Sequence, residues 1–212
     1  MFNRSRKSSG VTITEVLIGS AILSLFLLFG YRVFFGVSAG FSRGNWALST
    51  QNSLRNALNF VREEMQKASH RTEITVSTVD VTNRPFQLNE GTFDSNTQLA
   101  EWSIGIPFRT TAAVDPGAVY QCRLFLENGA IRYTKTLAEG SPGVERLYNN
   151  HLVLDNVALI ELEAVPFDPD NIATGSLIIM RIEVEHPDRV RYPGLRAEAE
   201  TGARVEVEVT GL

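Results

Sequence analysis

Residues 7–30 are KSSGVTITEVLIGSAILSLFLLFG, in which a lysine, two serines and a glycine precede a long apolar run. The run carries one charge near its head, Glu15, and the next charge is Arg32, so 16 uncharged residues lie between them. The 21 residues from Val11 to Tyr31 would reach about 30 Å as a helix, which matches the hydrocarbon core of a bilayer. The stretch therefore predicts a membrane-spanning helix.

The charges on either side of the run predict its orientation. Arg4, Arg6 and Lys7 precede it, and the polar bulk of the chain follows it. The positive-inside rule then places the N-terminus in the cytoplasm and the domain outside. The alternative is a secretory signal cut after residues 37–39, Val-Ser-Ala, but the length of the run and the intervening Arg32 argue against it.

Composition limits the classes of protein that fit. The chain has 212 residues, of which 43% are hydrophobic and 21% charged, which suits one folded domain plus a membrane segment. Without the three leader charges, 17 basic groups face 24 acidic groups, a balance of −7, so general nucleic-acid binding is disfavoured. Cys122 is the single cysteine, which excludes an internal disulfide and a thiolate metal cluster, and we expect it to be buried.

The carboxylate of Glu15 needs an explanation, because a charge at bilayer depth costs about 2.5 to 3.5 kcal/mol even on the lenient insertion scale. Such a charge normally marks a function and a partner. The alternative is that Glu15 lies at the headgroup boundary and contacts water.

Gly10 and the following VTITEVLI resemble the class III signal of type IV pilins and pseudopilins. The usual sequence of that signal is glycine, then phenylalanine-threonine-leucine-isoleucine-glutamate, then an apolar helix. The resemblance implies that a prepilin peptidase cuts after Gly10 and that Val11 becomes the methylated N-terminus. Thr12 and Glu15 then occupy the second and fifth mature positions, while Val11 and Thr14 depart from the usual residues.

The same resemblance implies a partner for Glu15. In this family the carboxylate is taken to meet the N-terminal amine of a neighbouring subunit in the filament core, where pairing offsets part of the desolvation of both charges. The implied partners are other minor and major pilins or pseudopilins, the peptidase, the inner-membrane assembly platform and membrane lipid. The implied location is the inner membrane with the C-terminal domain in the periplasm, and the tip of a pilus or pseudopilus after assembly.

The helical pattern continues past the span. Gly36, Gly40 and Gly44 recur every four residues and share one helix face, which permits close approach of another helix. The alternative is that they only loosen the helix, at about 1 kcal/mol each relative to alanine. From Trp46 the helix becomes amphipathic, and its apolar stripe predicts packing on a sheet; the stripe consists of Leu54, Leu58, Val61, Met65 and Ala68.

Beyond Arg71 the hydrophobic period changes to 2, and residues 127–129, Glu-Asn-Gly, predict a hairpin turn. The predicted inward positions are Tyr120, Cys122, Leu124 and Leu126; Ile160, Leu162 and Ala164; Ile178, Met180, Ile182 and Val184; and Val205, Val207 and Val209. Turn-rich stretches are expected at 83–97, 112–117, 138–150, 166–176 and 187–202. The predicted fold is α+β and type IV pilin-like, a long N-terminal helix packed on an antiparallel β-sheet. Its parts are a cleaved leader at 1–10, a membrane and filament-core helix at 11–35, an amphipathic helix at 36–70 and a periplasmic β-rich domain at 71–212.

No catalytic motif stands out, so we expect no enzyme and no cofactor. His70, His151 and His186 lie far apart in the sequence without the spacing of a metal site. Asp168 and Asp170 offer the alternative of a calcium site, although the aspartates and proline of residues 167–171 more often form a turn.

Two further stretches narrow the choice within the family. SLRNALNFVREEMQKA, residues 53–68, and LVLDNVALIELEAV, residues 152–165, resemble the W-type minor pilin and the J-type pseudopilin of type II secretion. Glu15 argues against the K-type tip subunit, which lacks that residue. The sequence thus favours a structural minor pilin that primes or caps a type IV pilus. The J-type pseudopilin, a signal-anchored periplasmic binding module and an exported hydrolase stay open as alternatives.

Overall fold

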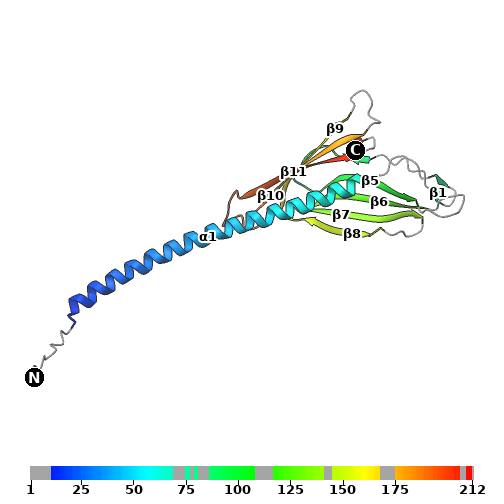
Figure 1. The fold of residues 1–212 in the computed structure, drawn as a ribbon. Helices are drawn as coiled ribbons and strands as arrows, with labels where there is room; N and C mark the ends of the chain where they lie inside the picture. The colour runs from blue at the N-terminus through cyan, green and yellow to red at the C-terminus, as the bar shows by residue number, and fades with distance from the viewer. Residues whose placement is uncertain are drawn as a thin grey trace, which may run out of the picture. The chain divides into compact units, whose positions relative to one another are not determined.

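The computed structural model describes residues 11–68, 75–76, 79–80, 86–107, 117–140, 145–167, 175–205 and 209–211. The chain divides into two compact units, Met1–Leu48 and Ser49–Leu212. One helix, α1 (Ile13–Gln66), contributes to both of them (Figure 1). The predicted long N-terminal helix is therefore confirmed, and it ends at Gln66 rather than at residue 70.

The strands belong to the second unit. They are β1 (Thr75–Val76), β2 (Val79–Asp80), β3 (Phe86–Leu88), β4 (Gly91–Phe93), β5 (Thr97–Pro107), β6 (Gly117–Glu127), β7 (Ala130–Gly140), β8 (Tyr148–Leu154), β9 (Val157–Pro166), β10 (Ser176–Glu185), β11 (Arg196–Val205) and β12 (Val209–Gly211). Within the described residues they form a two-stranded sheet, β1-β2, a four-stranded sheet, β11-β10-β9-β4, and a six-stranded sheet, β12-β3-β5-β6-β7-β8. The described pairings are antiparallel except that of β12 with β3, which is parallel.

The core forms where the outer part of α1 meets the inward faces of the two larger sheets. The predicted helix stripe is buried as expected, with Leu54, Leu58, Val61 and Met65 each at most 3% exposed. The inward positions of β6, β9 and β10 are confirmed too; the buried ones are Tyr120, Cys122, Leu124, Leu126, Ile160, Leu162, Ile178, Met180, Ile182 and Val184. Ala68 and Ala164 pack partly buried against this core.

The turn between β6 and β7 confirms the predicted hairpin. Asn128 and Gly129 occupy its two central positions with φ of 52° and 70°. Positive φ at both positions characterises the type I′ turn, whose twist matches that of the flanking strands, and Asn-Gly is its preferred sequence. The turn therefore fixes the register of β6 on β7.

Three expectations about the strands were wrong. A single sheet was expected, whereas two large sheets form. The expected turn-rich stretches at 83–97 and 187–202 contain strands, namely β3 and β4 in the first and most of β11 in the second. The inward side chains of β11 are small, with Ala197, Ala199 and Ala203 alternating with charged residues, so its hydrophobic alternation is weak. Val205 is buried at the end of β11 and Val209 begins β12, so the two do not share one strand; Val207 lies outside the described residues.

Candidate assembly surface

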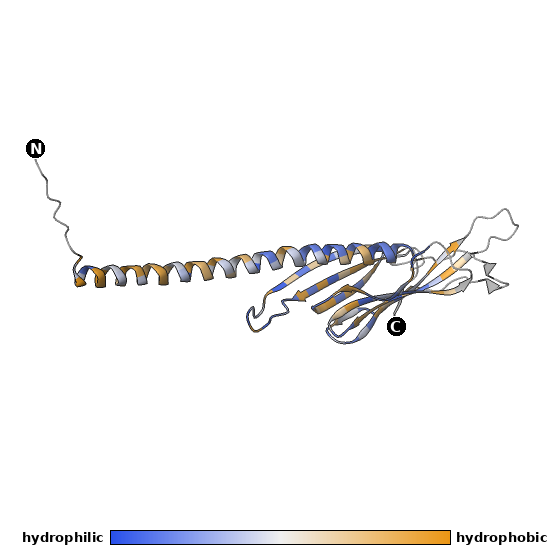
Figure 2. Cartoon of the chain, turned by 90° about the horizontal axis from the view of Figure 1, so that it is seen from below, coloured by the Kyte–Doolittle hydropathy of each residue, from blue (hydrophilic) through white to orange (hydrophobic). Residues whose placement is uncertain are grey.

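The first unit presents a largely exposed apolar helix surface. From Ile13 to Leu48 its large apolar side chains are between 51% and 80% exposed, except that of Trp46, which is half-buried. Figure 2 shows orange, apolar residues recurring along this part of α1. α1 is long and apolar enough to cross a membrane, and its most apolar window is not buried at all. This surface is compatible with single-pass membrane anchoring.

The exposed apolar surface is longer than a bilayer requires. The 38 residues from Val11 to Leu48 extend about 57 Å at the helical rise, whereas the hydrocarbon core is about 30 Å thick. Beyond Arg32, six large apolar side chains are exposed, and three of them are phenylalanines. The six are Val33, Phe34, Phe35, Val37, Phe41 and Leu48. Contiguous apolar surface outside the bilayer is characteristic of a protein–protein contact.

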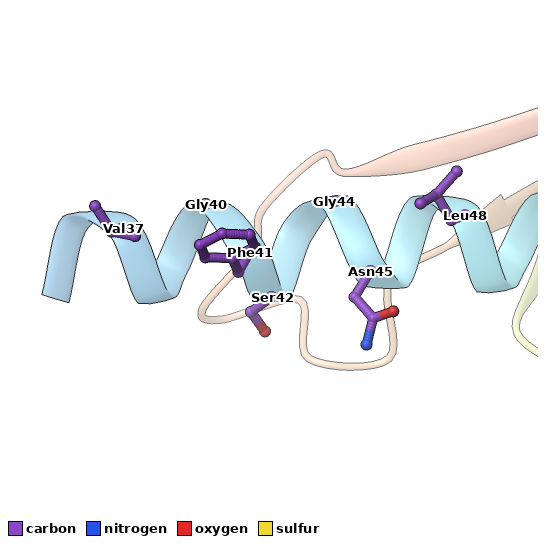
Figure 3. A pocket seen from close by; sticks show the side chains of 7 residues that line it. All are labelled: Val37, Gly40, Phe41, Ser42, Gly44, Asn45 and Leu48. Atoms are coloured by element: carbon purple, nitrogen blue, oxygen red, sulfur yellow. The ribbon is translucent and has the colours of Figure 1, made fainter. Parts of the chain in front are cut away.

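The three glycines lie on α1 within this surface. A Cβ atom built on Gly36, Gly40 or Gly44 would meet nothing within 4 Å. Gly40 and Gly44 line a groove of about 730 Å³, whose other lining residues are Val37, Phe41, Ser42, Asn45 and Leu48 (Figure 3). The helix backbone is thus open to close approach at these two positions, which is the geometry that small-residue helix contacts use.

Glu15 has a partner within its own chain. The backbone N–H and the hydroxyl of Thr12 donate hydrogen bonds to Glu15 Oε2, at 2.9 and 3.0 Å. The N–H of Glu15 in turn donates to Thr12 Oγ1 at 3.3 Å. This reciprocal pair is a capping box, in which a threonine before the helix and a glutamate three residues later satisfy backbone groups at its N-terminus.

The capping box was overlooked in the sequence, although Thr12-Ile13-Thr14-Glu15 carries its T-x-x-E signature. It supplies a reason for the carboxylate that requires no second chain. Both hydrogen bonds that Thr12 donates end on the same oxygen, Oε2. A carboxylate offers about four lone-pair positions, so the cap and a neighbour's amine are compatible with each other.

Some predicted positions lie outside the described residues. These are Gly10 and the calcium alternative at Asp168 and Asp170. Val11 is the first described residue, and its side chain is 74% exposed. The described ranges contain no cluster of three or more His, Cys, Asp or Glu placed to hold a metal ion.

A buried polar cluster joins the last turns of α1 to the six-stranded sheet, and sequence reasoning missed it. Glu64 is 5% exposed and Lys135 is fully buried. Glu64 Oε2 accepts a hydrogen bond from the Tyr133 hydroxyl at 2.7 Å and lies 3.4 Å from Lys135 Nζ. Glu64 Oε1 pairs with Lys67 Nζ at 2.6 Å, and Lys135 Nζ pairs with Glu145 at 2.6 Å.

The cluster is electrically balanced, with two carboxylates facing two ammonium groups. Burial alone would raise the pKa of Glu64, but hydrogen bonds from Lys67 and Tyr133 and the charge of Lys135 outweigh it and lower that pKa. Trp102 adds a hydrogen bond from its indole N–H to the carbonyl of Glu64 at 3.1 Å. The cluster therefore holds the end of α1 in one register on the sheet.

Cys122 lies beside this cluster, with its Sγ 3.1 Å from the Tyr133 hydroxyl. Its side chain is fully buried, as predicted, and burial raises the pKa of its thiol to about 12. A thiol that stays protonated is a poor nucleophile and a poor metal ligand. Cys122 therefore acts as a packing residue.

No protein-family model, curated protein or solved structure matches this chain.

Proposed function

We propose that the protein is a structural minor subunit of a type IV pilin-like filament, which it primes or caps through helix packing. The main support for the proposal is the part of the exposed apolar surface of α1 that exceeds the thickness of a bilayer. Six large apolar side chains remain exposed beyond the length that a bilayer can cover, namely Val33, Phe34, Phe35, Val37, Phe41 and Leu48, and Gly40 and Gly44 open the backbone among them. Apolar helices of sibling subunits would cover this surface.

The edges of the two large sheets support assembly through the helix rather than through strand pairing. Proteins protect edge strands with short lengths, charges and bulges. β4 and β12 are three residues each, and β11 alternates outward charges along its length. β8 departs from regular pairing with β7 at two places, and its Asn150 has a φ of 51°. In the described part of the chain, each edge strand of the two large sheets is thus protected against pairing with a strand of another chain. The exposed apolar surface of α1 has no such protection against association.

The J-type pseudopilin of type II secretion has the same anchoring and packing requirements and is retained as the second form of this proposal. A signal-anchored periplasmic binding module needs a span and a folded domain, but no apolar surface between them. The exposed segment at 33–48 therefore favours a filament subunit over an anchored module.

The proposal is tested by the processing of the chain. In cells that contain a prepilin peptidase, membrane-extracted protein should begin at a methylated Val11, as read by intact mass and N-terminal sequencing. A Gly10→Leu variant should stay uncut, because a large residue replaces the small one at the scissile bond. A chain that begins at Gly40 would show an ordinary secretory signal and contradict the proposal.

A further inference from the structure

The outer part of α1 carries a row of uncharged amide side chains along one side. Asn52, Asn56 and Asn59 follow one another at spacings of four and three residues, which place them on one face of the helix. All three are exposed. Arg55 is the only charged residue within 49–61, so this part of an exposed helix surface is polar almost without charge.

Helix formation does not explain the choice of asparagine at these positions. Asparagine is among the poorer helix formers, because its amide competes for backbone hydrogen bonds. Alanine, glutamate, lysine and glutamine are the residues that favour an exposed helix face. Within the described residues, none of the three amides makes a hydrogen bond to the protein. Their donors and acceptors are therefore open to a ligand.

A groove lies between this side of α1 and the edge strand β8. Its volume is about 320 Å³, at the lower end of the range of small-molecule sites. α1 and β8 both contribute to the lining, which consists of Ser53, Asn56, Ala57, Phe60, His151 and Val153. Among these lining residues there is no aspartate, glutamate, lysine or arginine. The groove therefore offers hydrogen bonds and apolar contact, but no full charge to pair with an ion.

Aromatic rings form the apolar part of the groove. The ring centroids of Phe60 and His151 lie 5.6 Å apart, with an angle of 62° between the ring planes. The ring of Tyr148 contacts both of them, at 5.6 Å from Phe60 and 5.2 Å from His151. These contacts hold the two lining rings in place beside the amide of Asn56. Rigid rings and open amides lower the entropic cost of binding, because little has to be ordered.

The lining matches a neutral ligand that has both hydroxyl groups and an apolar face. A saccharide has this chemistry, since its hydroxyls can donate to and accept from amides. The C–H groups on one face of a sugar ring can pack on aromatic rings, whose faces are negatively polarised. The row from Asn52 to Asn59 extends about 10 Å, so it can contact more than one sugar unit.

We propose that the groove between α1 and β8 binds a neutral saccharide. Ser53 and Asn56 hydrogen-bond its hydroxyls, and Phe60 and His151 contact its C–H face. The proposal applies to a filament subunit and to an anchored module alike, because the groove belongs to the Ser49–Leu212 unit. Its failure and the failure of the proposed function are therefore separable.

The test is saturation-transfer NMR on the full chain in a detergent whose headgroup is not a sugar. The probes are two neutral trisaccharides, chitotriose with acetamido groups and cellotriose with hydroxyls alone, and the anionic trigalacturonate. Saturation should pass to at least one neutral trisaccharide and not to trigalacturonate. Asn56→Ala and His151→Ala should each weaken the affinity about fivefold. Both residues are exposed, so unchanged melting of the two variants checks that they fold.

The matched control is Gln51→Ala, which removes an exposed amide of α1 that does not line the groove and should leave the affinity unchanged. No saturation transfer to either neutral trisaccharide would overturn the proposal. Affinities of Asn56→Ala and His151→Ala equal to that of the wild type would overturn it too. Capture of a sibling subunit by a photo-crosslinker at position 56, with or without trisaccharide, would assign the groove to a protein contact instead.

Discussion

Replacing Glu64 with alanine should destabilise the Ser49–Leu212 unit by about 3 to 5 kcal/mol, the usual effect of removing one partner of a buried ion pair. The variant would remove the more buried of the two carboxylates that pair with the fully buried Lys135. The remaining carboxylate, Glu145, is 31% exposed, so it would compensate the buried ammonium only in part. Tyr133 would lose its hydrogen-bond acceptor as well. Thermal unfolding of the full chain in detergent, followed by near-UV circular dichroism, measures the effect.

A double variant, Glu64→Gln with Lys135→Met, is the matched control. It removes the charge and its buried counter-charge together and should recover much of the lost stability, because an apolar replacement of a buried pair is often neutral. A Glu64→Ala protein that melts with the wild type would show that the cluster does not hold α1 on the sheet.

The lowered pKa of Glu64 sets the direction of the pH dependence. A carboxyl whose pKa is depressed by folding stabilises the native state above its ordinary value, here 4.5, and that contribution is lost as the pH falls through the lowered value. The wild type should therefore lose stability below about pH 4.5. The double variant Glu64→Gln with Lys135→Met should lose less over the same interval, because it lacks the carboxyl that titrates.

Replacing Glu15 with glutamine should leave membrane insertion intact and abolish incorporation into filaments. Insertion should even improve, because a charge leaves the apolar run. Incorporation should fail because the amine of the neighbouring chain would be buried without a counter-charge, at a cost of several kcal/mol. Filament counts and alkaline extraction of membranes, at matched expression, measure the two steps separately.

The capping box makes the choice of control variant important. Glutamine is also accepted at this position of a capping box, so Glu15→Gln keeps the helix start and removes only the charge. Thr12→Ala is the opposite control, since it removes the threonine hydroxyl that takes part in the cap and keeps the carboxylate. If Thr12→Ala blocks incorporation while Glu15→Gln does not, the carboxylate serves the helix end and the intersubunit pair is wrong.

Local patterns in the sequence were enough to predict the helix stripe, the β6–β7 hairpin and the inward faces of three strands, because each depends on neighbours a few residues apart. Glu64 was missed although it lies three residues after Val61, at a spacing that places it in the same stripe. A glutamate in an apolar stripe is expected at its margin, and only one of its partners, Lys67, is near in sequence, whereas Tyr133 and Lys135 lie 69 and 71 residues away. Only the tertiary structure brings Tyr133 and Lys135 to it.

The division into two sheets was missed for a similar reason. Period-2 alternation indicates that a strand has one buried face, but it does not indicate which strand is its neighbour. β11 was hidden further because alanines occupy its inward positions and charges its outward ones. Among the assembly residues, the glycine spacing predicted a shared helix face, and the structure adds that the backbone is open at Gly40 and Gly44.

In an assembled filament, the apolar surface of α1 beyond the span should contact helices of sibling subunits. A photo-crosslinking residue at Phe41, which is 75% exposed and lines the glycine groove, tests it directly. In cells that assemble filaments, we expect crosslinks from position 41 to the N-terminal helices of sibling pilins, and none from the matched position Thr136 on the sheet. Crosslinks from position 41 to lipid alone, in cells with normal filaments, would contradict it.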